Sequence, residues 1–154
     1  MEGVVRSSRP PRLPAFDYSA VRTYFVTACI RNRERVFSDP EVAAIARDVV
    51  LTYRERGRYY LYAYCIMPDH IHLLLKLRAR SGRLSTLVAV LKASIRHAAR
   101  HLDDVVWMRG FHERVKREYE DPNDYVKYTL LNPVRAGLVR ESKDYPFLGC
   151  VDTY

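Results

Sequence analysis

The 154-residue sequence lacks several features that would place it in whole classes of protein. Its three cysteines, Cys29, Cys65 and Cys150, are widely spaced and form no Cys-x-x-Cys pair. This excludes a disulfide scaffold and a cysteine-rich zinc site, and it fits a reducing cytoplasm. No apolar run approaches the roughly 20 residues of a membrane span, and the N-terminal segment has no apolar stretch typical of a secretory signal. We therefore expect a cytoplasmic protein with no membrane partner.

Negative charge is also scarce relative to positive charge. The 26 Lys and Arg residues against 18 Asp and Glu residues give a net charge of +8, with a pI near 9.6. A basic domain of this kind most often binds a polyanion, and nucleic acid is the first candidate. With 48% hydrophobic residues, the chain can bury a core. We expect a basic arm over 1–15, one folded domain over 16–142 and a tail over 143–154.

The order of patterned segments predicts the fold class. Apolar and β-branched runs predict four strands, and helical spacing predicts three helices, the first and third opening at Asp-Pro pairs. The third helix should end by Leu131, because residues before Pro133 avoid helical angles. The order β-α-β-β-α-β plus a helix predicts an α+β, ferredoxin-like split β-α-β fold with an antiparallel sheet and helices on one face. The predicted strands are Thr23–Ile30, Tyr59–Met67, Ile71–Leu77 and Phe111–Lys116, and the predicted helices are 40–57, Leu84–His101 and 121–131.

Two histidines stand out in the segment MPDHIHLLL. Ile71, Leu73 and Leu75 fall on one face of the predicted strand and would feed the core, whereas His70 and His72 leave the opposite face side by side. Two imidazoles in this arrangement can hold one divalent ion. The alternative is a pair of exposed histidines on the sheet surface. No acid-rich cluster follows, so a di-metal carboxylate site is not expected.

A second informative segment is YVKYTLLNPVRAGL. Tyr128 and Asn132 are one helical turn apart and share a face. An amide oxygen suits Mg²⁺ or Mn²⁺, and a tyrosine beside such an ion can act as a nucleophile on a phosphate. The alternative is that Tyr128 packs in the core and Asn132 caps the helix end.

Taken together and in order, MPDHIHLLL, GFHERV and YTLLNPVRAGLV resemble the single-tyrosine HUH transposases, specifically the REP-associated tyrosine transposase group. The resemblance covers Tyr24 to about Phe147 and agrees with that family's ferredoxin-like fold. It implies that His70 and His72 bind the metal, with Asn132 as the third ligand. It also implies that Tyr128, on an added C-terminal helix, is the nucleophile that forms a 5′-phosphotyrosine. One departure is Met108, between Trp107 and Arg109, where related sequences commonly have glutamine.

The resemblance implies an enzyme that cuts and rejoins single-stranded or hairpin DNA. Two alternatives remain: a domesticated DNA-binding protein of the same fold, and a metal-dependent phosphodiesterase that uses water and would not need Tyr128. By analogy with the REP-associated group we expect a monomer, with a dimer as the alternative. The candidate DNA-binding residues are basic, although such side chains are often merely solvated; they are Arg6, Arg9, Arg12, Lys92, Arg96, Arg100, Arg109, Arg114, Lys116 and Arg135.

Overall fold

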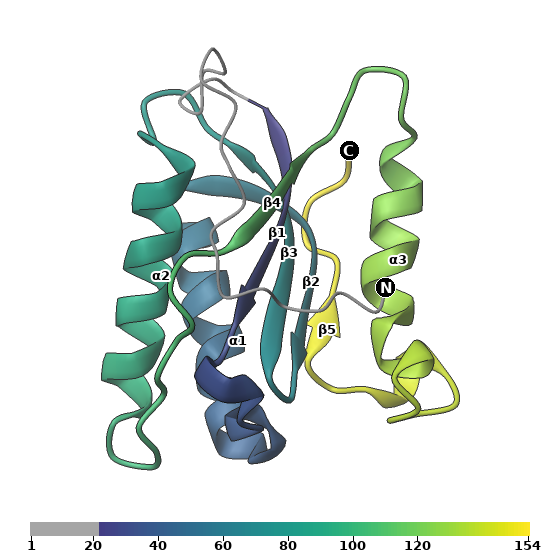
Figure 1. Cartoon of the computed structure of the whole chain (residues 1–154). Coiled ribbons are helices and arrows are strands. Elements are labelled where there is room, and N and C mark those ends of the chain that lie inside the picture. Colours follow the sequence, from purple (N-terminus) through teal and green to yellow (C-terminus); the bar gives the residue numbers. More distant parts are fainter. Residues whose placement is uncertain (1–21) are drawn as a thin grey trace.

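The computed structural model describes residues 22–154, which form one antiparallel sheet with helices on both of its faces (Figure 1). The predicted order of four strands and three helices is confirmed, and a fifth strand follows. Three short 3₁₀ turns also occur within the described residues. The elements are β1 (Thr23–Cys29), α1 (Pro40–Glu55), β2 (Tyr59–Met67), β3 (His70–Leu77), α2 (Leu84–Ala99), β4 (His112–Val115), α3 (Pro122–Arg135) and β5 (Leu148–Gly149). The candidate residues Arg6, Arg9 and Arg12 lie outside the described residues.

The strand order is β4-β1-β3-β2-β5, so β3 lies in the middle of the sheet. In the register of the sheet, His72 lies opposite Thr27 of β1 and opposite Cys65 of β2. His70 lies opposite Cys29 and Met67, where β1 and β2 end. The central strand therefore places both histidines near one end of the sheet, between β1 and β2.

Alternation along β3 divides its side chains between two layers of packing. Leu73 and Leu75 belong to the main core, which α1 and α2 cover. On the other face, Leu74 packs in a smaller cluster with Phe25, against which Tyr128 of α3 lies. Figure 1 shows α1 and α2 on one side of the sheet and α3 on the other. Only the first two helices thus share a face, and the third covers the face that carries the histidines.

The Asp-Pro pairs start helices as the sequence predicts. Asp39 accepts a hydrogen bond from the backbone N of Glu41, and Asp121 accepts one from Asn123, each with proline at the first helical position. The predicted end of α3 at Leu131 is wrong, because the helix continues through Pro133 to Arg135. Pro133 is buried in the last turn, where only one backbone hydrogen bond is lost.

The segment predicted as a tail, 143–154, packs onto the sheet instead. β5 pairs with β2, and the backbone N of Ile66 donates to Phe147 O at 2.8 Å. Asp152 accepts from the backbone N of Leu61 at 2.7 Å and pairs with Arg54. These polar contacts involve backbone groups of β2, and no hydrophobic pattern in a short segment reveals such contacts.

No helix in residues 22–154 is long and apolar enough to cross a membrane.

Candidate active site

The Nε2 atoms of the two histidines on β3 point toward each other. His70 Nε2 lies 3.0 Å from His72 Nε2, and the two rings are nearly perpendicular, with centroids 4.6 Å apart. Two nitrogen ligands about 2.1 Å from one ion, at a right angle, would be separated by about 3 Å. His72 is only 6% exposed. The pair is thus a partly enclosed site rather than two histidines projecting into solvent.

The other nitrogen of each histidine is held by a neighbouring side chain. His70 Nδ1 lies 2.6 Å from Asp69 Oδ1, and His72 Nδ1 lies 2.9 Å from Thr27 Oγ1. Arg33 in turn donates from Nε to Asp69 Oδ2 at 2.9 Å. With the Nδ1 atoms occupied in this way, both Nε2 lone pairs are available for a ligand, as in the supporting contacts around metal-binding histidines.

The protonation states in this network also suit a cation. Burial raises the pKa of Asp69, but the hydrogen bond and charge of His70 and the charge of Arg33 outweigh it and lower that pKa to about 2. Burial, followed by the nearby positive groups of His70, Arg135 and Arg33, holds the pKa of His72 well below its usual range. The Asp69 carboxylate is therefore charged and the His72 ring neutral near pH 7, and the neutral imidazole is the form that binds metal.

Among the described residues, no third side chain of the common ionisable types joins the two histidines. Within residues 22–154, no group of three or more His, Cys, Asp or Glu side chains is arranged to hold a metal ion. Asn132, one turn after Tyr128 on α3, has a buried Nδ2 without a hydrogen-bond partner. Rotation of the amide by 180° exchanges its nitrogen and oxygen, which would place the oxygen at this unsatisfied position. The residues present therefore fit a hard ion bound by two imidazoles, an amide and water.

Tyr128 lies on the sheet-facing side of α3, beside the histidines. Its ring centroid is 6.5 Å from that of His72 and 5.7 Å from that of Phe25, edge-on in both cases. Phe25 itself stacks on His72, with centroids 5.1 Å apart. Because α3 packs against its own sheet, the tyrosine and the histidines that meet here come from the same chain.

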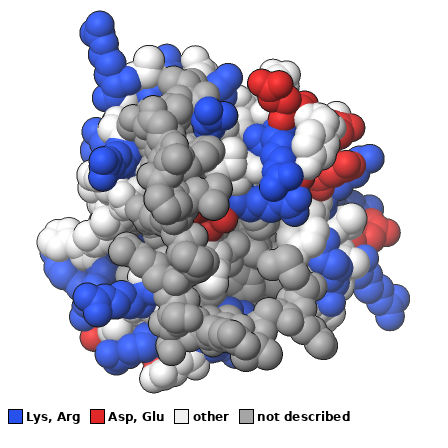
Figure 2. Space-filling view, turned by 45° about the horizontal axis from the view of Figure 1, so that its top comes forward, with Lys and Arg blue, Asp and Glu red and all other residues white. Residues whose placement is uncertain are grey.

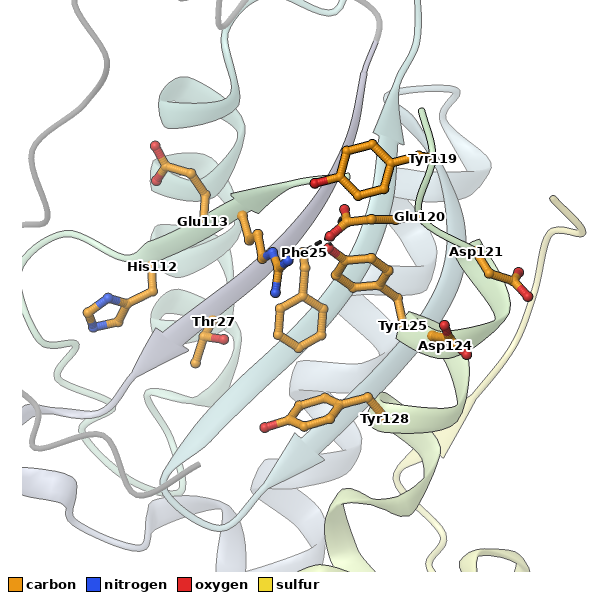
Figure 3. A pocket seen from close by; sticks show the side chains of 11 residues that line it. Phe25, Thr27, His112, Glu113, Tyr119, Glu120, Asp121, Asp124, Tyr125 and Tyr128 are labelled. Carbon is orange, nitrogen blue, oxygen red and sulfur yellow. Dashed lines mark hydrogen bonds and ion pairs between the residues drawn. The ribbon is translucent and has the colours of Figure 1, made fainter. Parts of the chain in front are cut away.

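Tyr125, three residues earlier, is less suited to act as a nucleophile. Its hydroxyl donates a hydrogen bond to Glu120 Oε2 at 2.8 Å, and burial together with this bond raises the pKa of Tyr125 to about 12. In the part of the chain that the structure describes, no side chain engages the hydroxyl of Tyr128 in this way. The two tyrosines, equally plausible by residue type, are thus distinguished by their surroundings (Figure 3).

Arg135, expected among the DNA contacts, also touches the tyrosine. Its guanidinium carbon lies 3.8 Å from the Tyr128 ring centroid, and Nη2 donates to the backbone O of Tyr128 at 2.7 Å. A guanidinium over an aromatic face is an attractive arrangement that restricts both groups. Arg135 is therefore placed to fix the Tyr128 ring between itself and Phe25.

The other candidate DNA-binding residues are dispersed over the molecule. Lys92 is half-buried and donates to the backbone O atoms of Met108 and Gly110, so it anchors the loop that carries the exposed Arg109. That loop joins the end of β1, because the backbone N of Met108 donates to Cys29 O, and Cys29 lies opposite His70. Arg109 thus lies at the histidine end of the sheet.

Arg96 on α2 and Arg100 directly after it lie on the opposite side of the sheet from α3. Arg96 pairs with Asp104 at 3.1 Å, and Arg100 donates to the backbone O of His97. On β4, Arg114 pairs with Glu120, and Lys116, directly after β4, lies 5.5 Å from the Tyr154 ring centroid. Figure 2 shows Lys and Arg side chains around much of one face, with most of the Asp and Glu side chains on the α3 side.

Three supporting residues were not predicted from the sequence. Thr27 reaches His72 only through the pairing of β1 with β3, and Arg33 lies in a turn with a φ of 54° that has no clear sequence signal. For Asp69, the position directly before His70 is the one sequence signal that identifies it as a partner of the imidazole.

Comparisons with known proteins identify the family of this chain. A family model described as "Transposase IS200 like" matches residues 19–114, a span that includes both histidines but ends before α3. A REP-associated tyrosine transposase of Escherichia coli is 26% identical over 125 residues, which cover 81% of this chain and 74% of that protein. A Haemophilus influenzae protein, named as a candidate member of the same group, is 25% identical over 146 residues, covering 85% of this chain and 81% of the relative.

A solved structure extends the similarity to the whole fold. It is that of a REP-associated tyrosine transposase bound to a REP hairpin, with a TM-score of 0.73 and 25% sequence identity. The alignment covers 92% of this chain and 81% of the solved one, so it reaches beyond the span matched by the family model.

Proposed function

Because this chain belongs to the IS200-like transposase family, we propose that it is a metal-dependent single-strand DNA endonuclease and strand transferase that works through a 5′-phosphotyrosine intermediate. The substrate we propose is hairpin or palindromic DNA. Support for that substrate comes from the solved relative, which is bound to a REP hairpin. The net charge of +8 is consistent with a nucleic acid partner.

The observation that carries the proposal is the meeting of Tyr128 with the histidine pair. The Tyr128 ring lies edge-on to that of His72, with centroids 6.5 Å apart, and His72 Nε2 lies 3.0 Å from His70 Nε2. Asp69 and Thr27 contact the other nitrogen of each imidazole. A protein that only bound DNA would have no need for this combination. A phosphodiesterase that used water as the nucleophile would not need Tyr128.

The mechanism follows from these residues. His70, His72 and Asn132 would hold a Mg²⁺ or Mn²⁺ ion, which when bound supplies positive charge next to the scissile phosphate. Tyr128 Oη gives up its proton to solvent and attacks the phosphorus in line, the bond from phosphorus to the 3′ oxygen breaks, and that oxygen takes a proton from solvent and leaves as a 3′-hydroxyl. The 5′-phosphate remains esterified to Tyr128.

A second 3′-hydroxyl can then attack the phosphotyrosine and displace Tyr128 Oη, which regains a proton. One phosphodiester is exchanged for another at each step, so the DNA is resealed without an external energy source. The contact of Arg135 with the ring and backbone O of Tyr128 would hold the nucleophile for both steps.

The test uses 3′-labelled hairpin oligonucleotides whose single-stranded flanks are randomised. With Mg²⁺ or Mn²⁺ we expect a labelled protein band that survives denaturation, and its loss in excess chelator, in His72→Ala and in Tyr128→Phe. Tyr128→Phe should still bind the hairpin, because affinity comes mainly from basic residues. The control Tyr60→Phe, which changes a partly exposed tyrosine on β2, should form the band normally.

Two results would contradict the proposal. Cleavage that yields free fragments and continues in Tyr128→Phe would point to water as the nucleophile. Hairpin binding without cleavage under any metal condition would point to a domesticated DNA-binding protein.

A further inference from the structure

A pocket of about 600 Å³ lies directly beside the proposed catalytic residues, between β4, the loop that follows it and the first turns of α3. Phe25, Thr27 and Tyr128 line this pocket and also contact the histidine site. Figure 3 shows side chains from β1, β4 and α3 arranged around it. If a phosphate of a DNA strand reached Tyr128, the neighbouring nucleotide of that strand would therefore lie at the pocket.

The walls of this pocket, which we call the aromatic pocket, are rich in rings. Phe25, Tyr125 and Tyr128 form a contiguous group, with the Phe25 and Tyr125 centroids 6.0 Å apart. Tyr119 also lines the pocket, although 78% of its surface is exposed, and Arg117 donates to its hydroxyl at 3.1 Å. An exposed ring beside half-buried and buried ones is a typical surface on which an unpaired nucleobase stacks.

The charge of the pocket argues against a phosphate as its occupant. Four carboxylates line it against one arginine, Arg114, in a chain that is strongly basic overall; the four are Glu113, Glu120, Asp121 and Asp124. Glu120 is fixed by three donors: Arg114, the hydroxyl of Tyr125 and the backbone N of Arg117. Carboxylates repel the DNA backbone but accept hydrogen bonds from the exocyclic amino groups of cytosine, adenine and guanine. Thymine offers no such amino group.

We propose that the aromatic pocket binds one unpaired nucleobase of the DNA strand adjacent to the phosphate that Tyr128 attacks, with a preference for bases that carry an amino group. The inference rests on the proposed function for the position of the strand. Stacking would provide affinity for any base, and the carboxylates would accept further hydrogen bonds from the amino groups of cytosine, adenine and guanine, which thymine lacks. The pocket would thus set the position of cleavage relative to the hairpin.

The test begins with a scan of abasic sites through the single-stranded flank of a cleaved hairpin. Binding is measured by fluorescence anisotropy with Tyr128→Phe, which cannot cut, and cleavage is measured with the wild-type chain. We expect a loss of about tenfold in affinity at one position adjacent to the scissile phosphate, the magnitude typical of one stacked base. At that position thymine should bind more weakly than the other three bases.

Tyr119→Ala, in the Tyr128→Phe background, identifies the pocket as the source of this effect. Its ring is mostly exposed, so removing it leaves the core intact. We expect the penalty for the abasic site to shrink several-fold in this variant and to stay unchanged in the matched control Tyr60→Ala. Tyr60 is also partly exposed but lies on β2, beside Arg78.

The outcomes separate the two proposals. A flat abasic scan, or a penalty that Tyr119→Ala leaves unchanged, would overturn the pocket assignment even if cleavage through Tyr128 is intact. A position-specific penalty that depends on Tyr119, in a chain that forms no covalent adduct, would support the pocket and contradict the proposed chemistry.

Discussion

At the scale of single residues, Asp69 connects the turn before β3 to the proposed metal site. It accepts from Arg33 and contacts His70 Nδ1, so it orients the imidazole without itself being a proposed ligand. We expect Asp69→Asn to weaken Mn²⁺ binding by about 10- to 100-fold, which is the usual effect of removing such a partner. Calorimetric titration of the DNA-free chain with Mn²⁺ measures this directly, without reference to cleavage.

The matched control is Asp104→Asn, which removes a carboxylate paired with an arginine on the opposite side of the sheet. Its Mn²⁺ affinity should equal that of the wild type. Equal affinity in Asp69→Asn as well would show that the Asp69 contact does not support the site.

A substitution of Arg135 can distinguish a role in positioning Tyr128 from a role in binding DNA. Since its guanidinium lies against the Tyr128 ring, we expect Arg135→Met to lower the single-turnover cleavage rate at saturating hairpin by roughly tenfold or more. The temperature of unfolding should change little, because Arg135 is exposed. A variant that binds the hairpin more weakly but cleaves at the wild-type rate once saturated would assign Arg135 to DNA contact alone.

At the scale of elements, Asp152 secures the last segment of the chain to the sheet. Its pKa is lowered, chiefly by the hydrogen bond from Arg54 and also by that from the Leu61 backbone. A lowered carboxyl pKa contributes stability above about pH 4, and this is lost as the pH falls through the folded-state value. Asp152→Asn should therefore reduce the free energy of unfolding at pH 7 by about 1 kcal/mol, a figure discounted because Arg54 is partly exposed.

Urea unfolding of both chains at pH 7 and pH 3 tests this, with Asp48→Asn at an exposed pair on α1 as the control. The difference between wild type and Asp152→Asn should shrink at pH 3, while Asp48→Asn should stay close to wild type at both. A difference that persists unchanged at pH 3 would contradict the role of the charged carboxylate.

The sequence predicts some features of these elements and misses others. Alternation in β3 correctly separated Leu73 and Leu75 from His70 and His72, because one side of a strand must be apolar to pack on a core. The end of α3 was missed because a proline in the final turn disrupts little. The roles of Thr27 and Arg33 depend on strand register and on one unusual turn, and local patterns do not encode such long-range pairings.

At the scale of the whole molecule, Tyr128 and the histidine pair meet within one chain. Tyr128 reaches the histidines because α3 packs on the sheet of the same protomer, through Tyr125, Val126 and Tyr128. We therefore expect a mixture of two inactive variants, His72→Ala and Tyr128→Phe, to form no covalent adduct with hairpin DNA. Recovery of activity in the mixture would mean that chains exchange their α3 helices, and would contradict a site formed in one chain.

The most direct measurement is mass spectrometry of the protein–DNA adduct after nuclease and trypsin digestion. Cleavage after Lys127 separates Tyr128, in the peptide 128–135, from Tyr119 and Tyr125, in the peptide 118–127. The account predicts a nucleotide mass on peptide 128–135, or, if the modification blocks cleavage at Lys127, fragment ions that place it on Tyr128. A nucleotide on Tyr125, or on any residue other than Tyr128, would contradict it.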